Sequence, residues 1–331
     1  MFPDKIYYEP ASLDYESGKF LKEKYNNIPW VPIESHNRID ELRTQPNKEF
    51  TNLKQHLVIG VRKTHKYVPN HKVSDFLVPY TSSGCTAMCH YCYLVCNYNK
   101  CSYLRIFVNR EQMLKKIIDH GTRYEKDFTY EIGSNSDLVL ENTITGNLAW
   151  TIEEFQKSPY GSLTFPTKFN KIEPLLGLNH GGRIIMRMSV NPQSIISRFE
   201  PGTSNLNARI SAINAMCDAD YRVGLLIAPV ILTENWKTLY QELIETLAEQ
   251  LTEKAKKNAP IEIIFMTYSY VHNAINSEAF PSSDKLYSKE LMTGRGRGKY
   301  CYRNDLRADG EHFLKTLIGE KLKEMSILYV V

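Results

Sequence analysis

The sequence predicts an α/β fold built on a mainly parallel sheet, because β-branched apolar runs alternate with helical segments along most of the chain. Parallel strands need crossover connections, which helices usually supply. About six such repeats fit a partial or complete barrel better than a three-layer sandwich. In either arrangement, functional side chains should lie just after the strands, at their C-terminal ends.

The expected elements follow from the spacing of the apolar residues. The strands are expected at 75–80, 103–108, 128–132, 163–169, 184–191, 221–231 and 261–268. Apolar residues at helical spacing predict helices at 109–124, 205–219 and 234–257.

The pattern divides the chain into three expected parts. Residues 1–75 are polar and aromatic with weak periodicity, and we expect an N-terminal extension. The core is expected at 76–275, followed by a C-terminal segment at 276–331. That segment contains TGRGRGKYCY (293–302), whose glycines and arginines predict a hairpin or loop.

Composition sets only loose limits on function. The formal charge of +4 permits a polyanionic partner without requiring one. The first 20 residues lack the apolar core of a secretory signal. The longest apolar run, Val223 to Leu232, is about half a bilayer span and is interrupted by Gly224 and Pro229. We therefore expect a cytoplasmic protein that does not bind membranes.

The cysteines are the most informative residues of the chain. Five of the seven are crowded into positions 85–101. A disulfide framework would spread its cysteines and would normally accompany a signal peptide, whereas clustered thiols in a reducing compartment more often bind metal. Cys85, Cys89 and Cys92 form a CxxxCxxC motif that follows a strand-like run and a glycine-containing loop.

Three thiolates, rather than four, indicate a [4Fe-4S] cluster with one iron open to a further ligand. S-adenosylmethionine can chelate that iron through its amino and carboxylate groups, and reduction of its sulfonium then yields a carbon radical. The alternative is a structural zinc site that recruits Cys96 or Cys101 as its fourth ligand. Zinc prefers four closed ligands in paired knuckles, and the second knuckle is absent from this sequence.

The stretch GCTAMCHYCYLVCNYNKCSYLRIFVN (84–109) resembles the cluster loop and following strand of the spore photoproduct lyase family. Further blocks resemble the family in the same order, at 130–139, 163–169, 186–212, 221–236 and 296–302. The resemblance implies a partial (β/α)6 barrel of the radical S-adenosylmethionine type, with an N-terminal extension and a C-terminal β-hairpin. It also implies repair of a thymine dimer lesion in spore DNA, the lesion being flipped out of the duplex.

The resemblance also implies roles for individual residues. Four positions at or just past strand ends match cofactor contacts: Ser136, Asp137, Lys168 and Ser189. Without it, Ser136 and Asp137 would be read as caps of the next helix, and Lys168 as a surface residue.

Two tyrosines of the motif match residues beside the cluster. Of Tyr91 and Tyr93, one is expected to pack on the cofactor and the other to take part in the radical relay. Their simpler interpretation is ordinary packing.

The Gly- and Arg-rich segment matches the family's DNA-contacting hairpin. Arg295, Arg297 and Lys299 are the expected phosphate contacts, and a solvated turn is the alternative. The expected partners are lesion-containing DNA and a reductant of the flavodoxin or ferredoxin type. The chain itself is expected to be a monomer. The resemblance implies that the cytoplasm in which it acts is that of the spore core.

One position departs from the family pattern. The cysteine that returns a hydrogen atom to the product is replaced by Ser134, whose O–H bond is too strong for that step. Cys301 and Cys96 are the preferred substitutes, ahead of Cys101, whereas Cys217 is expected in the core. The departure supports a second hypothesis, a radical paralogue that acts on RNA, a peptide or a small molecule.

Overall fold

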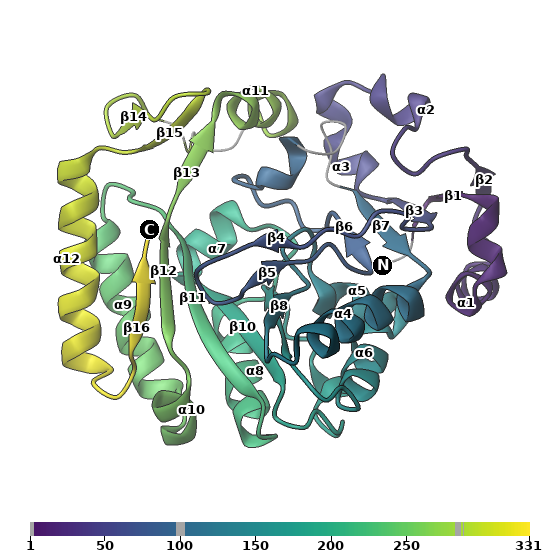
Figure 1. The fold of residues 1–331 in the computed structure, drawn as a ribbon. Helices are drawn as coiled ribbons and strands as arrows, with labels where there is room; N and C mark the ends of the chain where they lie inside the picture. The colour runs from purple at the N-terminus through teal and green to yellow at the C-terminus, as the bar shows by residue number, and fades with distance from the viewer. Residues whose placement is uncertain (1–2, 97–102, 282–285, 287) are drawn as a thin grey trace. The chain divides into compact units, whose positions relative to one another are not determined.

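The computed structural model describes residues 3–96, 103–281, 286 and 288–331. It divides into two compact units. Unit 1 comprises residues 1–86, 94–167 and 171–185, and unit 2 comprises 87–93, 168–170 and 186–331. Figure 1 shows the elements of each unit. The expected division of the chain near residues 75 and 275 stays a prediction.

Unit 1 contains a five-stranded sheet in the order β2-β1-β3-β7-β6. Its strands are β1 (Lys5–Tyr8), β2 (Trp30–Pro32), β3 (His56–Gly60), β6 (Ser82–Ser83) and β7 (Leu104–Phe107). All pairs are parallel except the antiparallel β6–β7 pair. Ile6, Leu57 and Ile106 are fully buried in its apolar core, on which α1 (Glu16–Lys24) packs through Leu21.

The N-terminal sheet differs from the expectation for residues 1–75. The strands are only three to five residues long and are separated by polar segments, so their periodicity is too short to recognise in the sequence. The run at 103–108 forms a strand as expected, but this strand, β7, pairs with β3 of the N-terminal sheet.

Unit 1 also contains the strand order β9-β8-β5-β4. These strands are β4 (Val68–Pro69), β5 (Phe76–Leu77), β8 (Thr129–Glu131) and β9 (Ser162–Thr167), and β5, β8 and β9 are parallel. The helices are α2 (Asp40–Arg43), α3 (Phe50–Leu53), α4 (Arg110–Tyr124), α5 (Leu138–Thr145) and α6 (Asn147–Phe155). The strand expected at 75–80 corresponds to β5, which is only two residues long.

Unit 2 contains the strand order β16-β12-β11-β10. The strands are β10 (Ile184–Val190), which begins in unit 1, β11 (Arg222–Val230), β12 (Ile261–Phe265) and β16 (Ile327–Val330). The helices are α7 (Gln193–Phe199), α8 (Leu206–Asp218), α9 (Trp236–Gln250), α10 (Glu253–Asn258), α11 (Tyr270–Ala279) and α12 (Asn304–Lys321). Helices α9 and α12 lie side by side in Figure 1.

Two expected elements of unit 2 are each divided in two. The helix expected at 234–257 is interrupted at Leu251, which is extended, and Thr252 caps α10 by accepting a hydrogen bond from the amide of Ala255. The run at 261–268 forms β12 and then β13 (Thr267–Ser269), which belongs to another sheet. There β13 and β14 (Met292–Gly294) flank β15 (Lys299–Tyr302) in an antiparallel sheet, and β14–β15 is the expected hairpin.

A buried carboxylate in unit 1 makes folding sensitive to acid. Glu9 accepts hydrogen bonds at 2.9 Å from the amide of His36, at 2.9 Å from its ring, and at 2.8 Å from the amide of Val61. Burial alone would raise the pKa of Glu9, but these bonds and the charge of His36 lower it to about 2.

We predict that Glu9→Gln reduces the acid sensitivity of unfolding. A lowered carboxyl pKa stabilises the fold above the unfolded value of 4.5, and this contribution is lost as the pH falls toward 2. It amounts to about 3 kcal/mol for Glu9. The free energy of unfolding, measured with urea, should therefore change less between pH 7 and pH 3 in Glu9→Gln than in the natural chain. The exposed Glu16→Gln is the control, and an equal pH dependence in both variants would contradict the prediction.

Candidate active site

The first part of the cysteine loop is held in unit 1. The amide of Gly84 donates to the carbonyl of Asn135 at 2.8 Å, and the hydroxyl of Ser136 donates to the carbonyl of Gly84 at 2.9 Å. Gly84 has a φ of +81°, which a glycine adopts without strain. Lys54, which is buried, donates to the carbonyl of Cys85 at 2.6 Å. The backbone around the first cysteine is therefore fixed by three contacts.

The second part of the loop is held in unit 2. The amide of Met88 donates to the carbonyl of Pro201 at 2.9 Å, and the amide of His90 donates to the carbonyl of Phe199 at 3.0 Å. These two bonds bracket Cys89. The His90 ring stacks on Phe280 with 4.4 Å between the ring centroids.

The last predicted ligand follows in a tight turn. The amide of Cys92 donates to the carbonyl of Cys89 at 3.1 Å, so these two thiols are carried by the same turn. Cys85, Cys89 and Cys92 are all partly exposed. Among the described side chains, no three His, Cys, Asp or Glu residues are gathered into a metal-binding group, so the three cysteines stay predicted ligands.

Ser136 and Asp137 have structural partners in unit 1. Ser136 accepts a hydrogen bond from Ser82 at 2.7 Å, besides donating to Gly84. Asp137 caps α5 by accepting from the amide of Leu140 at 3.1 Å, and it also accepts from the hydroxyl of Thr167 at 2.9 Å. The capping role considered from the sequence is thus present for Asp137, and cofactor contact stays a prediction for both residues.

Lys168 and Ser189 lie together in unit 2. The Lys168 ammonium donates to the Ser189 hydroxyl at 2.6 Å and to the carbonyl of Ala228 at 3.1 Å. Its side chain is only 20% exposed, which excludes the surface lysine considered from the sequence. The ammonium also lies 5.5 Å from the centre of the Tyr91 ring, so a residue of the cysteine loop is beside it.

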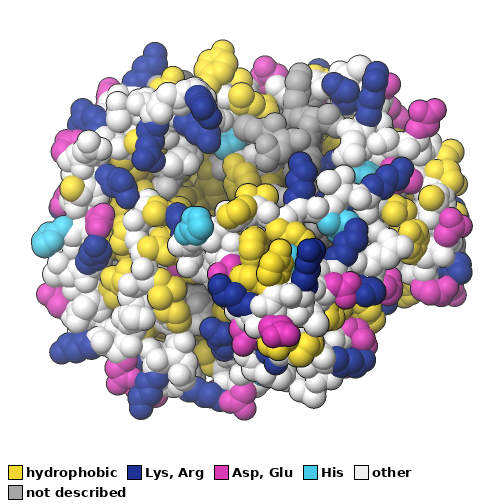
Figure 2. Space-filling view, viewed as in Figure 1, with side chains coloured by type: hydrophobic (Ala, Val, Ile, Leu, Met, Phe, Trp, Pro, Cys, Tyr) yellow, Lys and Arg dark blue, Asp and Glu magenta, His cyan; other side chains and the backbone are white. Residues whose placement is uncertain are grey.

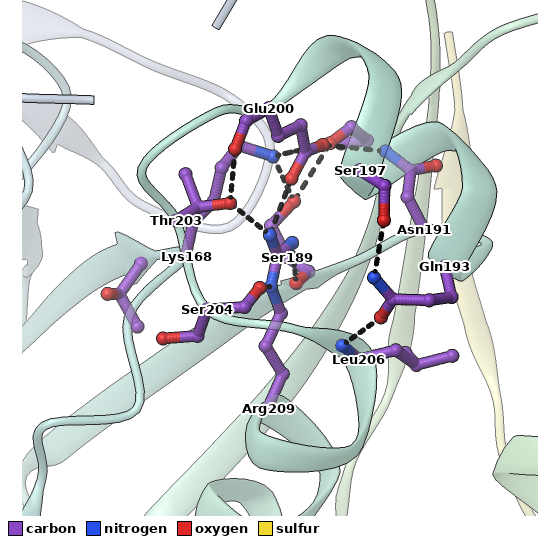
Figure 3. Close-up of polar contacts among 12 residues, drawn as sticks. Lys168, Ser189, Asn191, Gln193, Ser197, Glu200, Thr203, Ser204, Leu206 and Arg209 are labelled. Atoms are coloured by element: carbon purple, nitrogen blue, oxygen red, sulfur yellow. Dashed lines mark hydrogen bonds and ion pairs between the residues drawn. The ribbon is translucent and has the colours of Figure 1, made fainter. Parts of the chain in front are cut away.

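These residues surround a carboxylate that sequence reasoning missed. Glu200 accepts from Lys168 at 3.2 Å, from Asn191 at 3.1 Å and from Arg209 at 2.6 Å (Figure 3). It also accepts from the Tyr91 hydroxyl. Burial would raise the pKa of Glu200, but the charges of Lys168 and Arg209 lower it to about 2. Glu200 lies within one of the resembling blocks, but nothing in the sequence indicates that it is buried.

The remaining predicted residues are more scattered. Tyr93 is 54% exposed. Cys96 ends a short 3-10 helix (Tyr93–Cys96), and Cys101 lies outside the described residues. Cys301 is partly exposed on β15, where it pairs with Thr267 and Thr293. Because a strand alternates its side chains, Cys301 lies on the opposite face from Tyr300 and Tyr302.

Cys217 has the buried position expected from the sequence. It lies on α8 and is 2% exposed, and burial raises the pKa of its thiol to about 11. The described helices include none that is long and apolar enough to cross a membrane.

A family model described as spore photoproduct lyase matches the chain from residue 1 to residue 331. The chain belongs to the spore photoproduct lyase family. The spore photoproduct lyase of Bacillus subtilis (strain 168) is 32% identical over 96% of this chain and 93% of its own length. The spore photoproduct lyase of Geobacillus sp. (strain Y412MC61) is 29% identical over 99% of this chain and 98% of its own length.

Solved structures of spore photoproduct lyases have the same fold. One in complex with the dinucleoside spore photoproduct has a TM-score of 0.92 at 28% identity, covering 99% of both chains. A mutant form with bound AdoMet and the dinucleoside has a TM-score of 0.90 with the same identity and coverage. The predicted α/β fold of the partial-barrel type is confirmed by this match.

Proposed function

We propose that this chain is a radical S-adenosylmethionine lyase that splits the spore photoproduct in DNA back into two thymines. The match to the spore photoproduct lyase family along the whole chain carries this proposal. Solved relatives with the dinucleoside lesion and with AdoMet support the same substrate and cofactor. We assign the protein to the spore cytoplasm on the basis of this substrate.

The cysteine loop fits a [4Fe-4S] cluster. Thiolate sulfur is the usual ligand of such clusters, and Cys85, Cys89 and Cys92 are partly exposed on backbone that is fixed by hydrogen bonds. Together with S-adenosylmethionine, the cluster supplies hydrogen-abstracting one-electron chemistry when bound. It requires a reductant, which we propose is of the flavodoxin or ferredoxin type, and we propose that the chain acts as a monomer.

The chain's own residues would bind and orient the cofactor. Lys168 offers a positive charge beside the Ser189 hydroxyl, a combination suited to a carboxylate or a ribose hydroxyl. Ser136 and Asp137 offer further polar groups in unit 1, next to Gly84 of the cysteine loop. Tyr91 presents its ring to Lys168, and we propose that it packs on the cofactor.

The lesion radical must receive one hydrogen atom after the methylene bridge breaks. A thiol can provide it, because its S–H bond breaks as the C–H bond of thymine forms, whereas Ser134 cannot. We propose Cys301 or Cys96 as the donor and Tyr93 as the relay that restores the thiol. Ser134 also favours the second candidate, a paralogue that acts on RNA, a peptide or a small molecule.

We predict that the anaerobically reconstituted chain binds iron and converts the dinucleoside spore photoproduct to thymine in the presence of S-adenosylmethionine and reductant. Cys89→Ala should lose the iron and all turnover, because a ligand is removed. Cys217→Ala is the control and should retain both. Iron binding with 5′-deoxyadenosine formation, but without thymine, would favour the paralogue, and stoichiometric zinc would overturn the proposal.

We predict that one substitution among Cys301→Ala, Cys96→Ala and Cys101→Ala leaves lesion consumption intact but diverts the product from clean thymine. The trapped thymine radical should then form adducts that are detectable by mass spectrometry. Cys217→Ala again provides the control, since its thiol is buried. Clean thymine from all three variants would exclude these cysteines as donors.

The β14–β15 hairpin fits a phosphate-binding role. Arg295, Arg297 and Lys299 are exposed, and Lys and Arg side chains gather over the hairpin in Figure 2. The amide of Arg295 donates to the carbonyl of Lys299 at 2.8 Å, which closes the turn. We propose that these residues contact the DNA backbone, where they would add affinity without reading sequence.

Neutralising one of them should weaken DNA binding in a salt-dependent manner. We predict that Arg297→Gln lowers the slope of log affinity against log salt by roughly one, because one phosphate contact is lost. Lys254→Gln on α10, at the opposite end of unit 2 (Figure 1), is the control. An unchanged slope in Arg297→Gln would contradict the phosphate-binding role and favour the alternative, a solvated turn.

A further inference from the structure

Glu200 is the centre of the polar cluster in unit 2. It is 1% exposed, and both of its carboxylate oxygens are used. One oxygen accepts from Lys168 and Asn191, and the other accepts from Arg209 (Figure 3). The first oxygen also accepts from Tyr91. Buried charges are stable only when they are paired and hydrogen-bonded, and this carboxylate meets that condition through side chains from separate elements.

Two cations lie beside this carboxylate. Lys168 and Arg209 both form ion pairs with Glu200. Arg209 is fully buried, and its guanidinium also donates to Thr203 and to the carbonyls of Ser189 and Ser204. Lys168 is the partly exposed cation of the cluster, so it is the one that a ligand can reach. Such a position favours an anionic group of a ligand.

The same carboxylate is joined to the cysteine loop. Its own neighbours in the chain, Phe199 and Pro201, accept the backbone hydrogen bonds of His90 and Met88. Its side chain reaches the hydroxyl of Tyr91, one residue further along that loop. A displacement of Glu200 would therefore move both Lys168 and the loop.

We propose that Glu200 is a positioning residue that aligns Lys168 with the cysteine loop for S-adenosylmethionine binding. The inference rests on the proposed function, because it assumes that Lys168 contacts this cofactor. Glu200 itself is buried behind Lys168 and acts through it. Loss of its charge should weaken cofactor binding even where the fold and the cluster are retained.

Unit 2 contains a matched control. Glu262 is also 1% exposed, forms an ion pair with Arg187 at 3.0 Å and accepts a hydrogen bond from the hydroxyl of Tyr329. Like Glu200, it thus has an arginine and a tyrosine partner, but its hydrogen bonds within the described residues do not include Lys168. Glu262→Gln and Glu200→Gln should both lower the thermal midpoint, since each removes a buried ion pair with an arginine.

The test is the dissociation constant of S-adenosylmethionine, measured calorimetrically on anaerobically reconstituted full-length variants with matched iron content. Glu200→Gln should raise it about tenfold, and Glu262→Gln by less than about twofold. In a double-mutant cycle, Lys168→Met and Glu200→Gln should be non-additive, whereas Lys168→Met and Glu262→Gln should be additive. Equal dissociation constants for the two glutamine variants, or additivity in both cycles, would overturn the inference.

A second variant and a measurement on the natural chain complete the test. If Glu200→Gln does not fold, Glu200→Asp retains the charge for Arg209 but is one methylene shorter, and it should still raise the dissociation constant relative to Glu262→Asp. An unchanged constant in Glu200→Asp would overturn the inference. Absence of S-adenosylmethionine binding by the natural chain would instead refute the proposed function, so the two failures are distinguishable.

Discussion

Backbone hydrogen bonds between residues 88–90 and residues 199–201 are the interaction on which the proposed chemistry depends. A loop with three thiols has no regular structure of its own, and its ligands can be oriented only if other segments bind its backbone. In unit 2, the segment before α8 does this on both sides of Cys89. In unit 1, Lys54 and the turn at Asn135 and Ser136 do it beside Cys85.

Charge burial explains why these segments are so heavily hydrogen-bonded. Arg209 and Glu200 lie entirely inside unit 2, where an ion without a partner would be strongly unfavourable. The pair gains stability from the additional bonds to Thr203, Ser189 and Asn191, and these bonds also fix the chain between β10 and α8. The same network therefore serves the stability of unit 2 and the geometry of its candidate cofactor contacts.

Much of the α/β framework could be predicted from the sequence, because long strands such as β10 and β11 have apolar runs that periodicity detects. The parallel sheet of β1, β2 and β3 could not, since its strands are short and its pairing is set by tertiary contacts. The motif residues Cys85, Cys89 and Cys92 were evident from spacing alone. Glu200 was not, because no local pattern shows that a glutamate will be buried between a lysine and an arginine.

The structure shows the contacts of several residues whose roles were taken from the family resemblance. Lys168 and Ser189 lie in one hydrogen-bonded group, and Ser136 contacts the glycine before Cys85. Cofactor contact by these residues stays a prediction. Ser134 is the position at which this chain departs from the family pattern, and we propose that the departure affects the return of hydrogen rather than the binding of cofactor.

The most direct measurement is the electron paramagnetic resonance spectrum of the reduced, anaerobically reconstituted protein, recorded with and without S-adenosylmethionine. We expect a [4Fe-4S] signal that changes when the cofactor is added, because three cysteines leave one iron accessible to it. A cluster signal that does not respond to S-adenosylmethionine, or a protein that binds zinc in place of iron, would contradict the account.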